Sequence, residues 1–125
     1  MAKLRDDQPI FQQIAELIET NIIEGSLDVD ERVPSTNEIA KYYQINPATA
    51  AKGIQLLTEE GILYKRRGIG MFVSENAREI ILTKKRKQFK EHFVTPIIQE
   101  VKRININFDQ LIKMLREEYE NEDRS

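Results

Sequence analysis

Apolar residues recur every three or four positions along the start of the chain, the spacing of one helix face. They are Ile10, Ile14, Leu17, Ile18 and Ile22. Pro9 suits the first position of a helix and Gly25 offers a stop, so we predict a helix over residues 9–24. The acidic stretch that follows is expected to be a loop or a short extended segment, with Leu27 and Val33 as its anchors.

A second, shorter helix is predicted from the signal at its start. Ser35 precedes Glu38 by three residues, a capping-box pattern in which each side chain satisfies a backbone donor of the first turn. The inward side of this helix would carry Ile39, Ala40 and Tyr43. Gln44 and Ile45 then form a tight connection to the next element.

A third helix begins at Asn46 and Pro47, which suit the cap and the first helical position. Its buried stripe would be Ala50, Ile54 and Leu57. Gly61 is expected to end it. Two short helices joined by about three residues form a helix-turn-helix.

A β-hairpin is predicted after this pair of helices. The runs ILYKR and GMFVS, residues 62–66 and 70–74, are rich in β-branched and aromatic residues. They are separated by Arg67-Gly68-Ile69, where glycine permits a tight turn. Three helices and a hairpin in this order constitute a winged helix-turn-helix, for which we expect residues 1–75.

Residues 76–125 have a different pattern and are predicted to form two amphipathic helices in a hairpin. Pro96 lies inside the first stripe and removes a helical hydrogen bond, so we expect a kink near Val94 and Thr95 or a break there. Asn107 and Gln110 resemble a second capping start. The fold class is therefore mainly α with one small β-hairpin.

Two such helices cannot cover both of their own apolar faces. The spare surface predicts a partner, most simply a second copy of the chain. The residues expected at a dimer contact are Phe89, Phe93, Ile97, Val101, Ile104, Phe108, Leu111 and Leu115.

Length and composition limit the class of protein. A chain of 125 residues supports one domain, or a small domain with an appendage. It holds no cysteine, which excludes disulfides and thiolate metal sites. No apolar run approaches the roughly 18 residues of a membrane span, and the N-terminus lacks the apolar core of a signal peptide. We therefore expect a cytoplasmic protein with no membrane contact.

The formal net charge of -2 argues by itself against nucleic-acid binding. The charge is, however, unevenly distributed: eleven Lys and Arg but only four Glu lie between Lys41 and Lys90. A local basic excess on an acidic chain is what a protein with one polyanion-binding face would show.

The motifs PS at residues 34–35, NPAT at 46–49, EEGILY at 59–64 and RRGIGMFV at 66–73, followed by a short helical tail, resemble those of GntR-type bacterial transcription regulators. The tail is too short for a large sensor domain, so the resemblance is to the YtrA-type branch. It implies a regulator, most simply a repressor, that binds double-stranded operator DNA as a homodimer. YtrA-type regulators often lie beside transporter genes, which suggests an ABC transporter operon.

The resemblance places DNA-binding residues in three segments. Ser35, Thr36 and Asn37 begin the second helix, where amides and hydroxyls can hold a phosphate. Capping alone explains Ser35 equally well, and the family commonly has Arg at the Asn37 position. Pro47, Ala48, Thr49 and Lys52 lie on the third helix. Thr49 and Lys52 can reach bases or phosphates, whereas a solvated surface lysine is the alternative for Lys52.

On the third helix, small residues have two expected roles. Ala50 and Gly53 let it pack closely on its own domain, while Ala48 and Ala51 thin the side offered to DNA. Many relatives have Arg at the Ala51 position. Few hydrogen-bonding side chains therefore remain, and sequence preference is expected to rest more on DNA shape and on the wing.

The wing contributes Lys65, Arg66, Arg67, Gly68 and Gly70. The resemblance places Gly70 at the tip, where a missing side chain lets the backbone approach the minor groove. A plain hairpin turn is the alternative explanation of the two glycines. No dinucleotide-binding fold surrounds them, so a Rossmann motif is not expected.

Other features favour plain structural roles. The run Lys84 to Lys87, with Lys90, could graze flanking DNA, but a solvated helix face is the favoured interpretation. His92 is the single histidine and predicts no metal site. Phe89, Phe93, Met114 and Tyr119 could line a cavity for an unknown small-molecule effector, although core or dimer packing is favoured.

No cofactor is expected. No nucleophile-elbow or phosphate-loop pattern is present, so we do not expect an enzyme. The remaining alternative to a DNA-binding regulator is a winged-helix module that binds another protein without reading DNA.

Overall fold

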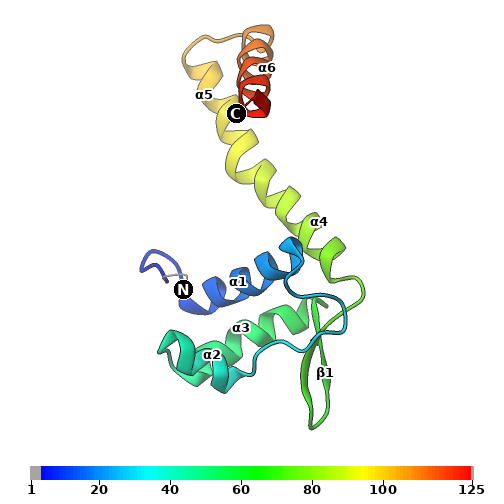
Figure 1. The fold of residues 1–125 in the computed structure, drawn as a ribbon. Helices are drawn as coiled ribbons and strands as arrows, with labels where there is room; N and C mark the ends of the chain where they lie inside the picture. Colours follow the sequence, from blue (N-terminus) through cyan, green and yellow to red (C-terminus); the bar gives the residue numbers. More distant parts are fainter. Residues whose placement is uncertain (1–3, 125) are drawn as a thin grey trace. The chain divides into compact units, whose positions relative to one another are not determined.

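The computed structural model describes residues 4–124 and contains the elements in the expected order (Figure 1). The helices and strands are α1 (Ile10–Glu24), α2 (Thr36–Tyr43), α3 (Pro47–Glu59), β1 (Leu63–Arg66), β2 (Gly70–Val73), α4 (Ala77–Phe89), the π-helical turn η1 (Lys90–Val94), α5 (Thr95–Arg103) and α6 (Phe108–Arg124). They form two compact units, Met1–Lys84 and Lys85–Ser125. The predicted mainly helical fold with one antiparallel hairpin is confirmed.

Local capping explains where α2 and α3 begin and where α2 ends. The hydroxyl of Ser35 accepts from the backbone N–H of Glu38 at 3.1 Å, and the Glu38 carboxylate accepts from the N–H of Ser35 at 3.0 Å. The amide oxygen of Asn46 accepts from the N–H of Ala48 at 2.8 Å. Gln44 adopts a left-handed φ of 55°, which reverses the chain between α2 and α3.

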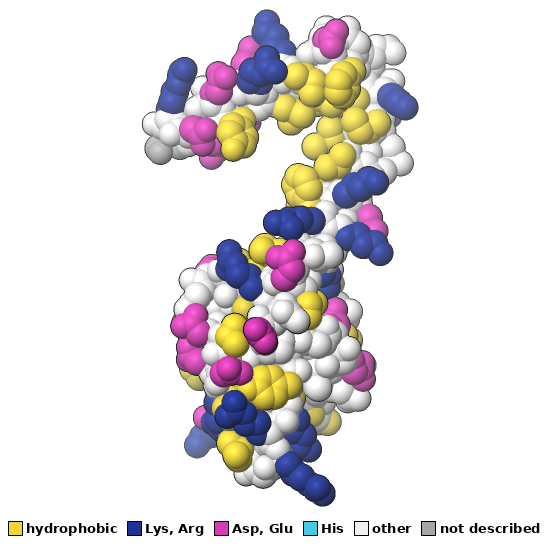
Figure 2. All heavy atoms as spheres, turned by 90° about the vertical axis from the view of Figure 1, so that its right-hand side faces the viewer, with side chains coloured by type: hydrophobic (Ala, Val, Ile, Leu, Met, Phe, Trp, Pro, Cys, Tyr) yellow, Lys and Arg dark blue, Asp and Glu magenta, His cyan; other side chains and the backbone are white. Residues whose placement is uncertain are grey.

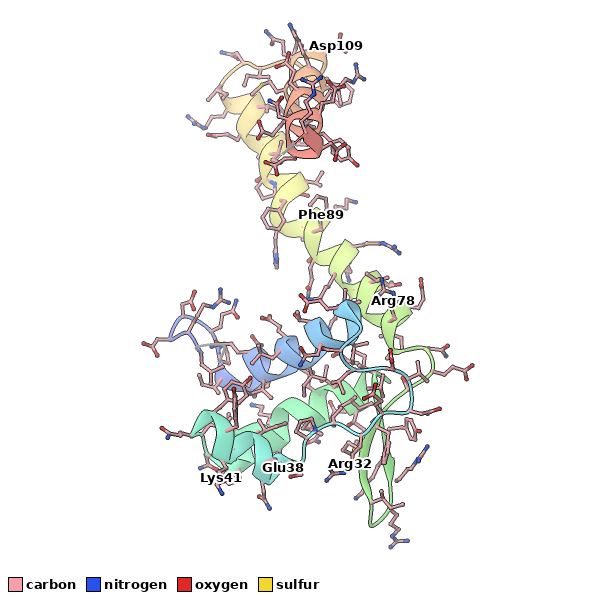
Figure 3. All side chains as sticks on the ribbon, viewed as in Figure 1. Arg32, Glu38, Lys41, Arg78, Phe89 and Asp109 are labelled. Carbon is pink, nitrogen blue, oxygen red and sulfur yellow. The ribbon has the colours of Figure 1, made fainter. Side chains whose placement is uncertain are left out.

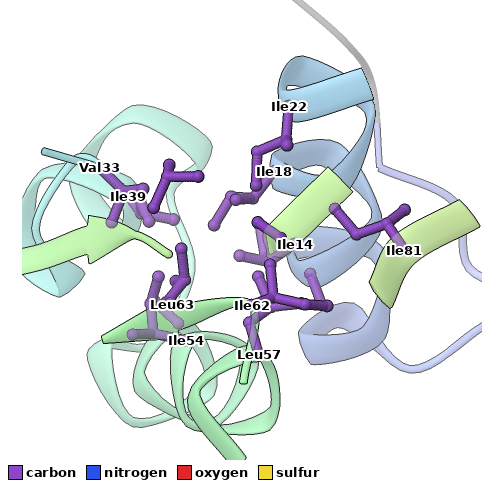
Figure 4. Packing of buried hydrophobic residues seen from close by; sticks show 14 of the residues in the cluster. Ile14, Ile18, Ile22, Val33, Ile39, Ile54, Leu57, Ile62, Leu63 and Ile81 are labelled. Atoms are coloured by element: carbon purple, nitrogen blue, oxygen red, sulfur yellow. The ribbon is translucent and has the colours of Figure 1, made fainter. Parts of the chain in front are cut away.

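One hydrophobic core fills the N-terminal unit (Figure 4). α1 contributes Ile14, Ile18 and Ile22, which meet residues of α2, α3 and the hairpin. Each fully buried aliphatic side chain stabilises the fold by about 1.5–3 kcal/mol relative to exposure. The predicted buried stripes of α1, α2 and α3 therefore all face one interior.

Gly53 lets α3 approach α1 closely, as predicted. A Cβ atom at this position would lie 2.8 Å from the carbonyl oxygen of Phe11 and 3.2 Å from the Cβ atom of Ile14. Ala50, one turn earlier, is fully buried. Close packing of α3 on α1 therefore requires small residues on this side of α3.

The acidic segment before α2 is extended and runs beside β2. Val33 donates its N–H to the Met71 carbonyl at 2.9 Å, and Val73 donates to the Glu31 carbonyl at 3.0 Å. Arg32 and Phe72 form an antiparallel bridge. Because the residues just before α2 are hydrogen-bonded to the wing, the start of α2 and the hairpin are held together.

The N-terminal unit extends nine residues further than the boundary that composition suggested at residue 75. Ala77 and Ile81 of α4 are fully buried and belong to the core of this unit. The ammonium of Lys84 forms ion pairs with Glu19 of α1 and, at 3.0 Å, with Glu60 after α3. The first two turns of α4 are therefore part of the winged domain.

Pro96 does not break the helix in which it lies. The backbone N–H of Thr95 bonds to the carbonyl of Lys90, an i→i+5 bond, and α5 continues directly. A proline ring clashes with the carbonyl four residues earlier in an α-helix, and the wider π-helical turn relieves this. The expected distortion is present as η1.

The second unit has little interior of its own. α5 ends at Arg103, and Ile104 is its C-cap. Before α6, Asn107 and Gln110 form a reciprocal pair in which each side chain accepts the other's backbone N–H. Among residues 85–124, Leu111 is the one apolar side chain that is buried.

Candidate nucleic-acid interface

The start of α2 and one face of the wing line a common hollow of about 300 Å³. Its lining includes three residues predicted from the α2 segment and two from the wing: Ser35, Thr36, Asn37, Lys65 and Gly70. Two sequence segments that were proposed separately are thus adjacent. The first-turn N–H groups of a helix carry a partial positive charge, so an anion in this hollow would meet amides and an ammonium together.

Ser35 acts as a helix cap, because its hydroxyl is bonded within the capping box. This bond also governs Glu38. Hydrogen bonds from the backbone and side chain of Ser35 hold the pKa of the Glu38 carboxyl below its usual value, with a smaller contribution from the charge of Arg32. Glu38 is therefore an anion at neutral pH and secures the first turn of α2.

Arg32 is a residue of this region that sequence reasoning missed. Its Nε atom donates to the Ile69 carbonyl at the wing turn at 3.3 Å, and its Nη1 atom lies 3.5 Å from the Glu38 carboxylate (Figure 3). The guanidinium therefore connects α2 to the wing. Arg32 is the one basic residue in the acidic segment between α1 and α2, which was the available signal.

On α3, Pro47, Ala48, Ala51 and Lys52 are exposed, and Thr49 is partly buried. The Lys52 ammonium lies over the Phe11 ring, 4.1 Å from its centroid. This cation–π contact places the exposed Lys52 side chain against α1 in the free protein. The exposed start of α3 offers mostly small apolar groups, as expected from the sequence.

Two basic residues of the wing, Lys65 and Arg66, lie on opposite faces of the hairpin. Lys65 faces the hollow, whereas Arg66 lies on the opposite face of the hairpin. The Arg66 guanidinium stacks on Phe72 at 4.3 Å and donates to the Tyr64 hydroxyl at 2.8 Å. That hydroxyl donates to Asp30 at 2.6 Å, and this bond is the main cause of the raised pKa of Tyr64. Arg66 is thus oriented before any ligand arrives.

The turn of the wing is formed by Arg67, Gly68 and Ile69, which are all exposed. Gly70 is not the tip, as the resemblance suggested, but the first residue of β2, where it pairs with Arg66. Gly68, with φ of 76°, occupies the turn itself. Lys and Arg side chains gather around this end of the hairpin in Figure 2.

The basic run in α4 and at the start of η1 is only partly a solvated face. Lys84 is held by Glu19 and Glu60, while Arg86, Lys87 and Lys90 are exposed. Burial lowers the pKa of Lys84, but its hydrogen bonds to the two carboxylates outweigh this and leave the pKa raised. Lys84 therefore remains charged and serves the packing of α4.

Exposed apolar side chains gather over part of the C-terminal unit (Figure 2). Those expected at a dimer contact that are exposed are Phe89, Phe93, Ile97, Ile104, Phe108 and Leu115. Phe108 is 67% exposed, whereas Leu111 is buried between the helices of this unit and Val101 is partly buried.

An open hollow of about 620 Å³ lies between α5 and α6. Of the residues suggested for an effector cavity, Met114 lines it and Phe89, Phe93 and Tyr119 do not.

Within residues 4–124, no cluster of three His, Asp or Glu side chains is arranged to hold a metal ion. No helix in the described part of the chain is long and apolar enough to cross a membrane.

The order of elements, the basic hairpin and its attachment to α2 define a winged helix-turn-helix protein. Residues 10–73 match the family of bacterial regulatory proteins named gntR. The chain is 32% identical over 94 residues to the HTH-type transcriptional repressor YtrA of Bacillus subtilis, a match that covers 75% of this chain and 72% of YtrA. The chain belongs to the GntR family, in its YtrA-type branch, and is a DNA-binding transcriptional regulator.

Solved structures agree with this assignment. One from Bacteroides thetaiotaomicron, assigned to a transcriptional regulator of the GntR family, has a TM-score of 0.79 at 27% identity and covers 90% of this chain and 98% of that one. The DNA-binding domain of AraR in complex with operator ORX1 has a TM-score of 0.53 at 29% identity, and the match covers 59% of this chain and 90% of that one.

Proposed function

We propose that the protein is a repressor that binds a palindromic operator as a homodimer. The observation that carries this proposal is the joint placement of Lys65 and the first turn of α2 around one hollow. Phosphate contacts there would fix the position of the domain on DNA. α3 would then lie in the major groove with its small residues against the bases.

Sequence preference in this proposal rests on DNA shape more than on hydrogen bonds from α3. Lys52 is held by Phe11, and Gln55 donates to Glu59 at 3.0 Å, so both polar side chains already have partners. Thr49 remains as the polar side chain nearest the start of the helix. Few direct contacts with bases leave groove width and deformability as the main source of selectivity.

The exposed apolar face of the second unit supports the homodimer. Phe93 is 58% exposed and Leu115 is 48% exposed in a unit with a single buried apolar residue among those described. Such a surface needs a partner to remove it from water, and an identical chain is the simplest one. Two-fold symmetry of the dimer implies a palindromic operator.

Binding should weaken steeply as the salt concentration rises. Each Lys or Arg that contacts a phosphate releases bound cations from the DNA, and this release is less favourable when salt is already abundant. Changing Lys65, Arg66 and Arg67 together to Ala is expected to flatten the plot of log affinity against log salt by up to about 3, since each phosphate contact contributes about 0.9. Lys102→Ala, which removes a charge from α5, is the matched control. An unchanged slope in the triple variant would contradict the proposed interface.

Sedimentation tests the dimer separately. Phe93→Glu and Leu115→Glu should each shift the protein toward the monomer mass at micromolar concentration. Tyr42→Glu changes an exposed aromatic residue of the first unit and should leave the mass unchanged. A monomeric wild-type protein would refute the homodimer.

The genes that neighbour this one on the chromosome would test control of an ABC transporter operon.

A further inference from the structure

An apolar residue occupies the turn of the basic wing. Ile69 is 61% exposed and stands between Gly68 and Gly70, with three basic residues immediately before Gly68. Isolated apolar residues are ordinary on protein surfaces, so exposure alone means little. The argument therefore depends on how Ile69 is held and on what surrounds it.

The backbone of Ile69 is fixed from both sides. Its N–H donates to the Arg66 carbonyl at 3.0 Å, which closes the turn. Its carbonyl accepts from the Nε atom of Arg32 at 3.3 Å, and Arg32 also lies 3.5 Å from Glu38 of α2. With both peptide groups of Ile69 engaged, the turn is tied to α2.

The residues on either side leave Ile69 uncovered. Gly68 and Gly70 have no side chains, and a Cβ atom at Gly68 would meet nothing within 4 Å. Arg67 and Lys65 supply positive charge nearby, and the minor groove is the part of DNA where such charge is attracted, most strongly where the groove is narrow. An exposed isoleucine among these cations is thus presented to DNA together with them.

We propose that Ile69 is a specificity-determining residue that contacts the minor groove and favours A·T pairs beneath the wing. This inference rests on the proposed function. A·T and T·A pairs present only acceptors on the minor-groove floor, whereas G·C adds the guanine amino group. Isoleucine has no acceptor, so an amino group covered by its side chain loses water and gains no partner.

The placement of Ile69 over specific base pairs can be mapped because the chain contains no cysteine. The full-length protein would first select a tight-binding duplex from a random pool. Arg67→Cys, modified with an iron chelate, then carries a single cleavage reagent at the wing turn. The centre of strand cleavage identifies the base pairs beneath Ile69.

Three duplexes test the preference, with A·T, G·C or inosine·C pairs at the mapped positions. Inosine lacks the amino group of guanine. We expect A·T and inosine·C to bind alike and G·C about tenfold more weakly, equivalent to about 1.4 kcal/mol. In Ile69→Ala the G·C penalty should fall below about twofold. In Arg67→Ala the penalty should persist while the salt slope decreases.

The outcomes separate this inference from the function on which it rests. Equal binding of G·C and inosine·C, or a penalty that persists in Ile69→Ala, would overturn the role of Ile69 and leave the repressor intact. Failure to select any duplex would overturn the proposed function, and the inference with it. Because Ile69 is exposed, Ile69→Ala should keep the wild-type melting temperature, which excludes misfolding as the cause.

Discussion

A Cβ atom on Gly70 would lie 2.9 Å from the Nε atom of Arg32. The guanidinium that connects α2 to the wing therefore passes over the one position of β2 that lacks a side chain. Gly70 also has a φ of 145°, which L-residues rarely adopt. Glycine at this position is required within the protein itself, independently of any close approach to DNA.

Gly70→Ala should lower the free energy of unfolding by about 2 kcal/mol or more, from backbone strain together with the clash. In an Arg32→Ala background the loss should be smaller by about 1 kcal/mol, because the clash is gone and the strain remains. Gly68→Ala, where a Cβ meets open space, should cost the same in both backgrounds. Urea denaturation of the four combinations measures the coupling, and additive effects would contradict the contact.

Gly53→Ala tests the close packing of α3 on α1. Alanine improves helix propensity by about 1 kcal/mol, but its methyl group would press on the Phe11 carbonyl, where overpacking costs about 1–3 kcal/mol. We expect a net loss of about 1 kcal/mol in urea denaturation. Ala51→Gly, on the exposed face of α3, is the control: it measures the difference in helix propensity between alanine and glycine without a change in packing. A stabilised Gly53→Ala variant would show that the helices can separate freely.

Lys84→Met should lower the free energy of unfolding by about 2 kcal/mol, because the buried carboxylate of Glu19 loses its ammonium partner. The figure is below that of a fully buried pair, since Lys84 is a quarter exposed. Adding Glu19→Gln should restore much of the loss. Lys87→Met, an exposed change on the same helix, is the control. Thermal and urea unfolding measure the free energy of unfolding of each variant. Equal losses in Lys84→Met and Lys87→Met would contradict the prediction.

Glu38→Gln should reveal an acid-dependent contribution to stability. The folded pKa of Glu38 is lowered, so its contribution is present above the unfolded pKa of about 4.5 and is lost as the pH falls through the folded pKa. Glutamine still completes a capping box. Wild type should therefore be more stable than Glu38→Gln at pH 7, and the difference should vanish at low pH. Glu16→Gln on α1 is the control, and a pH-independent difference would refute the role of the charge.

The helix boundaries could be predicted because side chains mark them locally. Ser35 with Glu38, Asn46 with Pro47, and Asn107 with Gln110 all stand within three residues of their partners, so the signal is readable in one dimension. The turn residues Gly25 and Gly68 act in the same way. Local signals therefore gave the order of elements without knowledge of the fold.

Contacts between distant residues could not be predicted in this way. Arg32 and Ile69 are 37 positions apart, and Lys52 and Phe11 lie on different helices. Whether a lysine stays in solvent or lies on a ring depends on tertiary packing, which periodicity does not specify. The same reason explains why the pattern predicts a boundary at residue 75, whereas the first compact unit extends to Lys84: a helical pattern does not say which unit covers Ile81.

The π-helical turn before Pro96 has a consequence for the direction of the apolar side chains. Phe89, Phe93, Ile97 and Val101 are spaced by four residues, and in an α-helix of 3.6 residues per turn each such step drifts by about 40° around the axis. A turn closed by i→i+5 bonds holds more residues, so the drift across Lys90–Val94 is smaller. η1 thus offsets part of this rotation. Apolar residues that recur every fourth position therefore stay closer to one line along the helix than they would in an ideal α-helix.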